Sequence, residues 1–168
     1  KIYKKIKKMR LFIFCCLFVF LTARKIDAVC DTPTLADVSD LDWFWGLWYE
    51  IYRDEEFFWE KNSQCNTAHY DEYDETDGTF RIYNSKIKEG KTKRKGRKAK
   101  GKCDDTLNQC YTKFWLSYAG DYRILSTDES TYLVVYSCSA KGNTKSNVNV
   151  WILSKDVTLS EVTITAIQ

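Results

Sequence analysis

The sequence predicts an all-β domain built from antiparallel strands. Short runs of β-branched and aromatic residues recur between turn signals, about every 8–12 residues, as in β-sandwiches and β-barrels. Helical periodicity is scarce, and Pro33 is the only proline. With 168 residues, including 6 Trp, 11 Tyr and 9 Phe, the chain is long enough for one domain with an aromatic-rich interior. Periodicity alone does not choose between sandwich and barrel.

The first 28 residues predict a leader and a secretory signal peptide. Met9 and Arg10 precede an apolar run that ends at Leu21, and this run is too short to span a bilayer. Cleavage after Ala28 leaves residues 29–168 as the single domain of a secreted, extracellular protein without a transmembrane segment. The cleaved segment carries eight basic residues and one acidic residue, so its loss changes the formal net charge from +3 to −4.

The strands follow one another along this domain. Turn signals separate several of them, including Asp77-Gly78, which is typical of a hairpin. A helix is expected to begin within residues 158–168. Strands are predicted at residues 48–52, 67–73, 79–84, 110–118, 122–126, 131–138 and 147–154.

A basic run lies between the third and the next predicted strand. Residues 86–102 contain ten Lys or Arg and a single acid, Glu89. Periodicity does not assign the part from Lys91 to Lys102, and a strand here would place cations on both faces. The main interpretation is a solvated basic loop; the alternative is a surface that binds anionic glycans or lipids. The run has no aromatic residue, so nucleic acid is not an expected partner.

The cysteines favour an exported protein with disulfides. Cys103 and Cys110 lie at adjacent ends of two neighbouring segments, which predicts a hairpin disulfide, with pairing of Cys65 to one of them as the alternative. The predicted mature chain holds an odd number, which leaves one partner missing, intermolecular or free: Cys30, Cys65, Cys103, Cys110 and Cys138.

Three segments carry a family resemblance. The first strand opens with Gly46-x-Trp48-Tyr-Glu-Ile, the hairpin at residues 122–138 contains Thr127-Asp128-x-x-x-Tyr132, and residues 150–155 end in Lys155. In order and spacing they resemble the three motifs of the lipocalin family, most of all its branch of apolipoprotein D, insect bilin-binding proteins and insecticyanins. The resemblance implies an eight-stranded antiparallel up-and-down β-barrel, or calyx, with a partial C-terminal helix.

The resemblance also implies structural roles. Trp48 is expected to plug the closed end of the barrel, with Lys155 stacked on its ring as a cation–π partner, where the family usually has Arg. A disulfide between Cys30 and Cys138 is implied. The family partner of Cys65 lies in a tail after the helix, so we expect the sequence to be truncated at its C-terminal end.

The function implied by the resemblance is carriage of a small hydrophobic ligand inside the barrel, such as a bilin pigment, retinoid, sterol or fatty acid. No cofactor is required beyond such a ligand. Tyr70 and Trp115 are the first candidates for the wall, and outward exposure or plain core packing is the alternative for each candidate. The full set of expected ligand-binding residues is Glu50, Tyr52, Ala68, Tyr70, Trp115, Tyr132, Val134 and Tyr136.

No catalytic or metal site is predicted. His69 is the only histidine and is expected to point outward, and the chain lacks a nucleophile elbow, a phosphate-binding glycine loop and metal-ligand spacing. We therefore expect a binding protein rather than an enzyme. The alternative to a carrier is a secreted interaction or inhibitor protein that binds anionic partners through the basic run.

Overall fold

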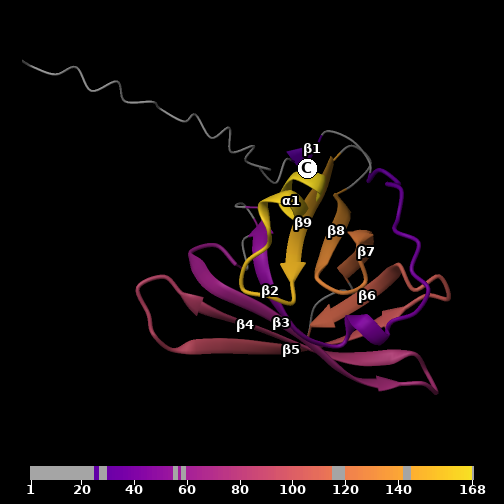
Figure 1. Ribbon diagram of the computed structural model, residues 1–168, viewed down its shortest axis with the longest axis horizontal. Coiled ribbons are helices and arrows are strands. Elements are labelled where there is room, and N and C mark those ends of the chain that lie inside the picture. The colour runs from indigo at the N-terminus through magenta and orange to yellow at the C-terminus, as the bar shows by residue number, and fades with distance from the viewer. Residues whose placement is uncertain are drawn as a thin grey trace, which may run out of the picture.

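The computed structural model describes residues 25–26, 30–54, 57, 60–114, 120–141 and 145–167. Each strand from β2 to β8 pairs antiparallel with the next one in sequence, and β9 pairs with both β8 and β2. The sheet therefore closes on itself (Figure 1), which confirms the eight-stranded antiparallel up-and-down barrel. Its strands are β2 (Gly46–Arg53), β3 (Ser63–Asp74), β4 (Thr79–Lys88), β5 (Arg94–Cys103), β6 (Gln109–Phe114), β7 (Gly120–Thr127), β8 (Tyr132–Lys141) and β9 (Lys145–Ser154).

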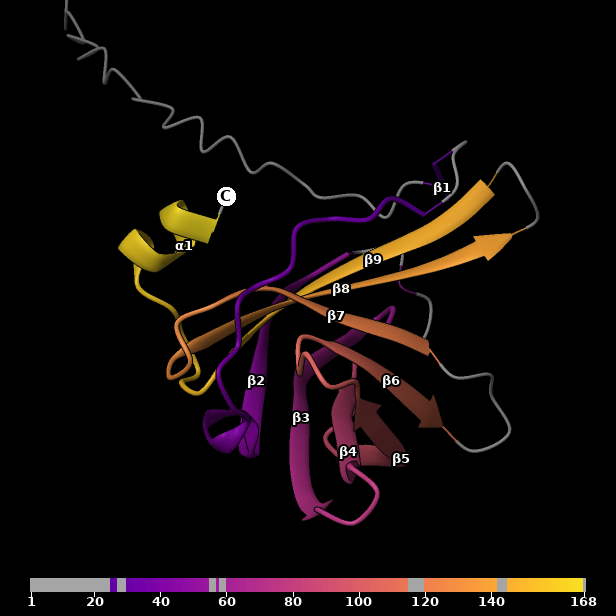
Figure 2. The ribbon, with the colours of Figure 1, turned by 90° about the vertical axis from the view of Figure 1, so that its right-hand side faces the viewer.

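Three short elements flank the barrel. The 3-10 helix η1 (Asp42–Phe44) leads into β2, and α1 (Glu161–Ile167) follows β9 with no buried residue. In Figure 2, α1 stands away from the barrel wall at the end of the sheet opposite to β1. Among the described residues, no helix is long and apolar enough to cross a membrane.

β1 (Lys25–Ile26) adds a two-residue edge to β9, with Lys25 opposite Asn147 and Ile26 opposite Ser146. It belongs to the segment that the sequence predicts to be removed. The apolar run before it lies outside the described residues. Cleavage after Ala28 stays a prediction, and the barrel itself closes through β9 and β2 without β1.

The basic run forms a strand, which corrects the expectation of a solvated loop. β5 pairs with β4 from Thr79↔Lys102 to Ile87↔Arg94 and with β6 from Ala99↔Phe114 to Cys103↔Cys110. A strand is tolerated because Ala99 and Gly101 are the only two buried residues of β5. Gly101 leaves room for the ring of Phe80, whose Cζ would lie 2.2 Å from a Cβ at position 101.

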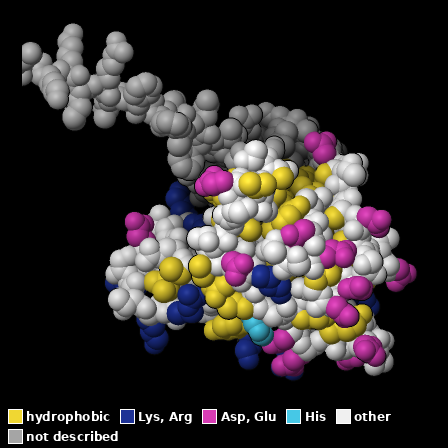
Figure 3. Space-filling view, viewed as in Figure 1, with side chains coloured by type: hydrophobic (Ala, Val, Ile, Leu, Met, Phe, Trp, Pro, Cys, Tyr) yellow, Lys and Arg dark blue, Asp and Glu magenta, His cyan; other side chains and the backbone are white. Residues whose placement is uncertain are grey.

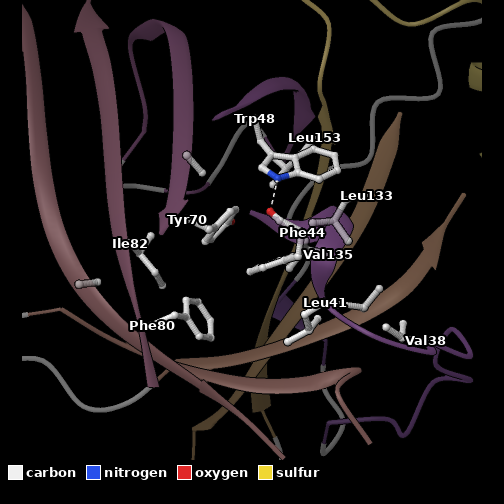
Figure 4. Packing of buried hydrophobic residues seen from close by; sticks show 13 residues of the cluster. Val38, Leu41, Phe44, Trp48, Tyr70, Phe80, Ile82, Leu133, Val135 and Leu153 are labelled. Atoms are coloured by element: carbon white, nitrogen blue, oxygen red, sulfur yellow. Dashed lines mark hydrogen bonds between the residues drawn. The ribbon is translucent and has the colours of Figure 1, made fainter. Parts of the chain in front are cut away.

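The closed end of the barrel is built around Trp48, which is fully buried with Phe44. Trp48 Nε1 donates a hydrogen bond to the carbonyl oxygen of Phe44 at 2.7 Å (Figure 4). Lys155 Nζ lies 4.2 Å from the centroid of the Trp48 ring and donates to the Trp45 carbonyl at 2.5 Å. The expected cation–π contact between Lys155 and Trp48 is present, and the role of Trp48 as a plug stays a prediction. Gly46 adopts φ +98°, a backbone conformation that favours glycine.

The β7–β8 hairpin is organised by the Thr127-Asp128 pair. Asp128 Oδ1 accepts hydrogen bonds from the backbone N–H groups of Ser130, Thr131 and Tyr132, and Thr127 Oγ1 donates to the Tyr132 carbonyl. Partial burial acts to raise the pKa of Asp128, but hydrogen bonds from the Thr131 hydroxyl and from the three backbone N–H groups outweigh it and hold the pKa below the usual value. The motif therefore fixes the turn.

Two disulfides link described residues, and both match the expected pairs. Cys30–Cys138 ties the N-terminal segment to β8, and Cys103–Cys110 closes the β5–β6 hairpin. The alternative pairing of Cys65 with Cys103 or Cys110 is thereby excluded. Cys65 is an exposed free thiol.

Candidate ligand-binding site in the barrel interior

Strand register shows which side chains face the barrel interior. Side chains alternate along a strand, and residues that are paired across a ladder share a face. Trp48 pairs with Ala68, Tyr70 with Ile82, and Leu133 with Leu153. Figure 4 shows this interior packing. The buried cluster comprises Val38, Leu41, Phe44, Trp48, Ala68, Tyr70, Phe80, Ile82, Ala99, Ile124, Leu133, Val135 and Leu153.

Aromatic rings fill the part of the interior that lies next to η1. Phe44 from η1 lies 4.3 Å from Tyr70 and 5.6 Å from Phe80, measured between ring centroids. The hydroxyls of Tyr70 and Tyr122 are hydrogen-bonded at 3.0 Å. Burial raises the pKa of both tyrosines, so both remain neutral phenols. This end of the interior offers apolar ring faces together with a single polar pair.

A polar cluster continues the same face towards the other end of β2. Glu50 is paired with Leu153 of the interior cluster, and its side chain is only 7% exposed. Glu50 Oε1 accepts hydrogen bonds from Arg53 Nη1 at 2.5 Å and from Asn66 Nδ2 at 2.8 Å. Asn66 precedes Ala68 by two residues on β3 and is itself buried. Glu50, Arg53 and Asn66 thus form a polar network inside the barrel.

Glu60 reaches this network from the loop between β2 and β3. Its Oε2 accepts a hydrogen bond from Trp151 Nε1 at 3.1 Å, and the Trp151 ring packs edge-on against Phe57 with centroids 5.0 Å apart. Burial, followed by repulsion from the Glu50 carboxylate, raises the pKa of Glu60 to about 7, with Arg53 acting in the opposite direction. The Glu60 carboxyl therefore takes up or releases a proton near neutral pH.

Three buried polar atoms along this face have no hydrogen-bond partner in the part of the chain that the structure describes. They are Arg53 Nε, Asn66 Oδ1 and Asn84 Oδ1. Asn84 follows Ile82 by two residues and pairs with Ala68, which places it on the interior face. Buried polar groups in folded proteins nearly always have partners. The cluster therefore has unused hydrogen-bonding capacity, most of it as acceptors.

Tyr52 does not face the interior, which corrects its expected position. A β-bulge lies between Glu50 and Tyr52, so that Tyr52 pairs with Ile152 and Arg53 with Trp151. A bulge inserts one residue and reverses the alternation beyond it. Tyr52 is consequently 42% exposed, and Arg53 takes the interior position.

The interior face of β8 is also the opposite of the expected one. Leu133 and Val135 belong to the interior cluster, whereas Val134 and Tyr136 alternate with them and lie outside it. Both faces of β8 are nevertheless buried. On the outer side, the Arg123 guanidinium lies 6.0 Å from the Tyr136 ring and donates to the Asp31 carbonyl of the N-terminal segment. Tyr132 shares the outer parity, and its hydroxyl hydrogen-bonds to Ser126.

Glu50, Ala68 and Tyr70 lie on the interior face, and their contact with a ligand stays a proposal. Trp115 lies outside the described residues. Within them, no group of three or more His, Cys, Asp or Glu is arranged to hold a metal ion. Five further residues in or beside the polar cluster were not predicted from the sequence: Arg53, Glu60, Asn66, Asn84 and Trp151. Strict alternation along β2 would place Arg53 on the outer face, and the bulge that moves it inward cannot be read from the sequence. Glu60 comes from a loop, where no periodic pattern indicates which side chains face the interior.

A family model described as a lipocalin-like domain matches residues 39–168. Insecticyanin from the tobacco hornworm Manduca sexta superposes with a TM-score of 0.71 at 22% sequence identity, covering 86% of this chain and 79% of that one. Apocrustacyanin C1 gives 0.68 at 17% identity, covering 84% and 79%. Per a 4 from cockroaches gives 0.63 at 18%, covering 84% and 83%. No curated protein matches the sequence significantly.

Proposed function

Because this chain belongs to the lipocalin-like domain family, we propose that it is a secreted carrier of a small hydrophobic ligand held inside the barrel. Proteins of this family are generally binding proteins rather than enzymes. The observation that carries the proposal is the interior wall, where aromatic rings meet a small polar network at Glu50 and Glu60. Ligand sites commonly combine apolar lining with a few placed polar groups. The two disulfides support export to an oxidising compartment.

The ligand classes we propose are bilins, retinoids, sterols and fatty acids, each with an apolar body and a polar end. Titration of the purified protein with biliverdin, retinol, progesterone and oleate should change tryptophan emission saturably, at about one ligand per chain. Trp115→Ala should weaken binding by about 1–3 kcal/mol, as expected when an aromatic ring against the ligand is removed. Absence of binding by all four ligands would refute the carrier function.

A second candidate function rests on the outer face of β4, β5 and β6. Arg81, Lys100 and Lys113 are aligned across the three strands, and Lys98 and Lys102 flank Lys100 on the same face of β5. In the view of Figure 3, Lys and Arg lie mainly along the left and the lower edge of the molecule, and most Asp and Glu lie on the right. We name these five side chains the basic face. Like charges in direct opposition destabilise a sheet, so an anionic partner would stabilise this arrangement. The candidate function is docking to an anionic glycan or lipid surface.

Arg94 does not belong to the basic face. Its Nη1 donates to the Cys65 carbonyl at 2.9 Å and to Ser85 Oγ at 2.8 Å, so it braces β5 against β3 and β4. Replacing Lys98, Lys100 and Lys113 by Gln should therefore lower the salt concentration that elutes the protein from heparin. The matched control replaces Lys88, Lys91 and Lys93 around the β4–β5 turn, with the same change in charge. Equal losses in both variants would show a general charge effect and no docking face.

A further inference from the structure

From the interior polar cluster we infer that the barrel binds a protonated amine carried on an apolar or aromatic body, with Glu50 and Glu60 receiving the ammonium group. This inference rests on the proposed carrier function and narrows its ligand class. The cluster lies on the same wall as the aromatic rings, since Trp151 hydrogen-bonds to Glu60 and is packed against the core.

Among the described residues, charge balance in the cluster leaves one carboxyl without a counter-ion of its own, since the single cation Arg53 faces both Glu50 and Glu60. Arg53 forms an ion pair with Glu50 at 2.5 Å. Glu60 has the Trp151 indole as a neutral donor and shares a hydrogen bond with Glu50. Repulsion between the two carboxyls contributes to the raised pKa of Glu60, about 7. A ligand cation beside Glu60 would displace the proton of the Glu60 carboxyl and would relieve the repulsion between Glu50 and Glu60.

The unpartnered atoms point independently to a donor. Asn66 is 6% exposed, and its amide nitrogen is engaged by Glu50 while Oδ1 has no partner. Asn84 Oδ1 on β4 is also unpartnered. An ammonium group has three donors and no acceptor, which suits a site where the unused groups are mainly acceptors. A ligand carboxylate would instead face Glu50 and Glu60, a like-charge contact.

The surrounding rings suit a cation as well. Trp151 and Phe57 pack against each other beside Glu60, and both Glu50 and Glu60 lie close enough to Tyr70 to act on its phenol electrostatically. Aromatic faces attract cations, most strongly where water is excluded. The site therefore combines two carboxyls with rings from the β2–β3 loop, β3 and β9.

The test uses three ligands that share a ring and differ in head charge. They are 2-(1-naphthyl)ethylamine, 2-(1-naphthyl)ethanol and 1-naphthylacetate, titrated calorimetrically into the full chain at pH 7. We expect the amine to bind at least about tenfold more tightly than the alcohol, a difference of about 1.4 kcal/mol, and the acetate to bind most weakly. Amine binding should release protons, seen as a heat that depends on the ionisation enthalpy of the buffer.

Two variants separate head-group recognition from folding. Glu60→Gln should reduce amine affinity to that of the alcohol and abolish proton release, while alcohol affinity is retained. Glu89→Gln, at an exposed turn, should leave all three affinities unchanged. Equal binding of amine and alcohol by the wild type, or no naphthyl binding while retinol still binds, would overturn the amine inference and leave the carrier function standing. Loss of retinol binding as well would overturn both.

Discussion

Trp48 is fixed by three kinds of contact at once. Its ring is fully buried, its indole N–H is hydrogen-bonded to Phe44, and Lys155 covers one ring face. The Lys155 ammonium group is partly buried, and this burial lowers its pKa. These contacts support the expected role of the ring as a structural plug, which a substitution can test.

Replacement of Trp48 by Ala should lower the free energy of unfolding by about 3–5 kcal/mol, because the surrounding chain cannot collapse into the space of an indole. Urea denaturation followed by circular dichroism measures the change. Lys155→Arg should keep most of the stability, since guanidinium also stacks on rings. A loss below about 1 kcal/mol in Trp48→Ala would mean that the plug is not essential for stability.

The Glu60 carboxyl predicts a dependence of stability on pH. Its pKa rises from 4.5 in the unfolded chain to about 7 in the folded protein. Between these values the folded state binds more protons than the unfolded state, so the free energy of unfolding falls as pH rises through this range. Glu60→Gln should remove this fall, making the variant more stable than the wild type at pH 8 and closely similar at pH 4. Denaturation at both pH values checks it, with Glu89→Gln as control.

At the scale of the element, β8 and β2 show what alternation can and cannot predict. The existence and order of the barrel strands other than β5 follow from the sequence, because turn residues separate the β-rich runs. The basic run of β5 has no such pattern, so this strand was not predicted. The interior face of β8 does not follow from the sequence either, since Leu133 to Tyr136 are all buried and the strand is apolar on both faces. In β2, a bulge that leaves no mark in the sequence moves Arg53 inward. Alternation along a strand therefore predicts which side chains face the interior only as far as the first bulge.

The β5 strand places a lysine opposite basic residues on both neighbouring strands, of which Arg81 is also ion-paired with Glu72. Lys100 lies between Arg81 and Lys113 in the ladder. Lys100→Glu should raise the free energy of unfolding by about 0.2–1 kcal/mol, because it converts repelling cross-strand pairs into attracting ones. The gain should shrink in high salt, which screens exposed charges. Lys91→Glu, at the exposed β4–β5 turn, should give a smaller gain; an equal one would show that only net charge matters.

At the scale of the whole molecule, the N-terminal segment is tied across the barrel by Cys30–Cys138, over a sequence separation of 108 residues. Family motifs made this pair and the barrel predictable. The polar cluster was not predictable, because it assembles Glu60 from a loop with residues from three strands. Such a site depends on tertiary approach, which neither local pattern nor spacing encodes.

Removal of the long-range disulfide should cost more than removal of the short one. A cross-link restricts the unfolded chain more when it closes a longer loop, by about 4–5 kcal/mol near 100 residues and about 2.5 kcal/mol for the Cys103–Cys110 hairpin. Urea denaturation of the Cys30→Ser/Cys138→Ser and Cys103→Ser/Cys110→Ser variants compares them. A larger loss for the hairpin pair would contradict the chain-entropy argument.

The two glycines of β5 set how freely this strand can evolve. A side chain at Gly101 would collide with Phe80, which is buried and has no room to turn, whereas a side chain at Gly96 would collide with Tyr83, which is exposed and can swing aside. Drift at the neighbouring lysines meets no such barrier. Substitutions at the lysines can therefore change the surface charge of this wall in evolution without disturbing the packing of the barrel. Gly101 is the position of this strand that has to be kept.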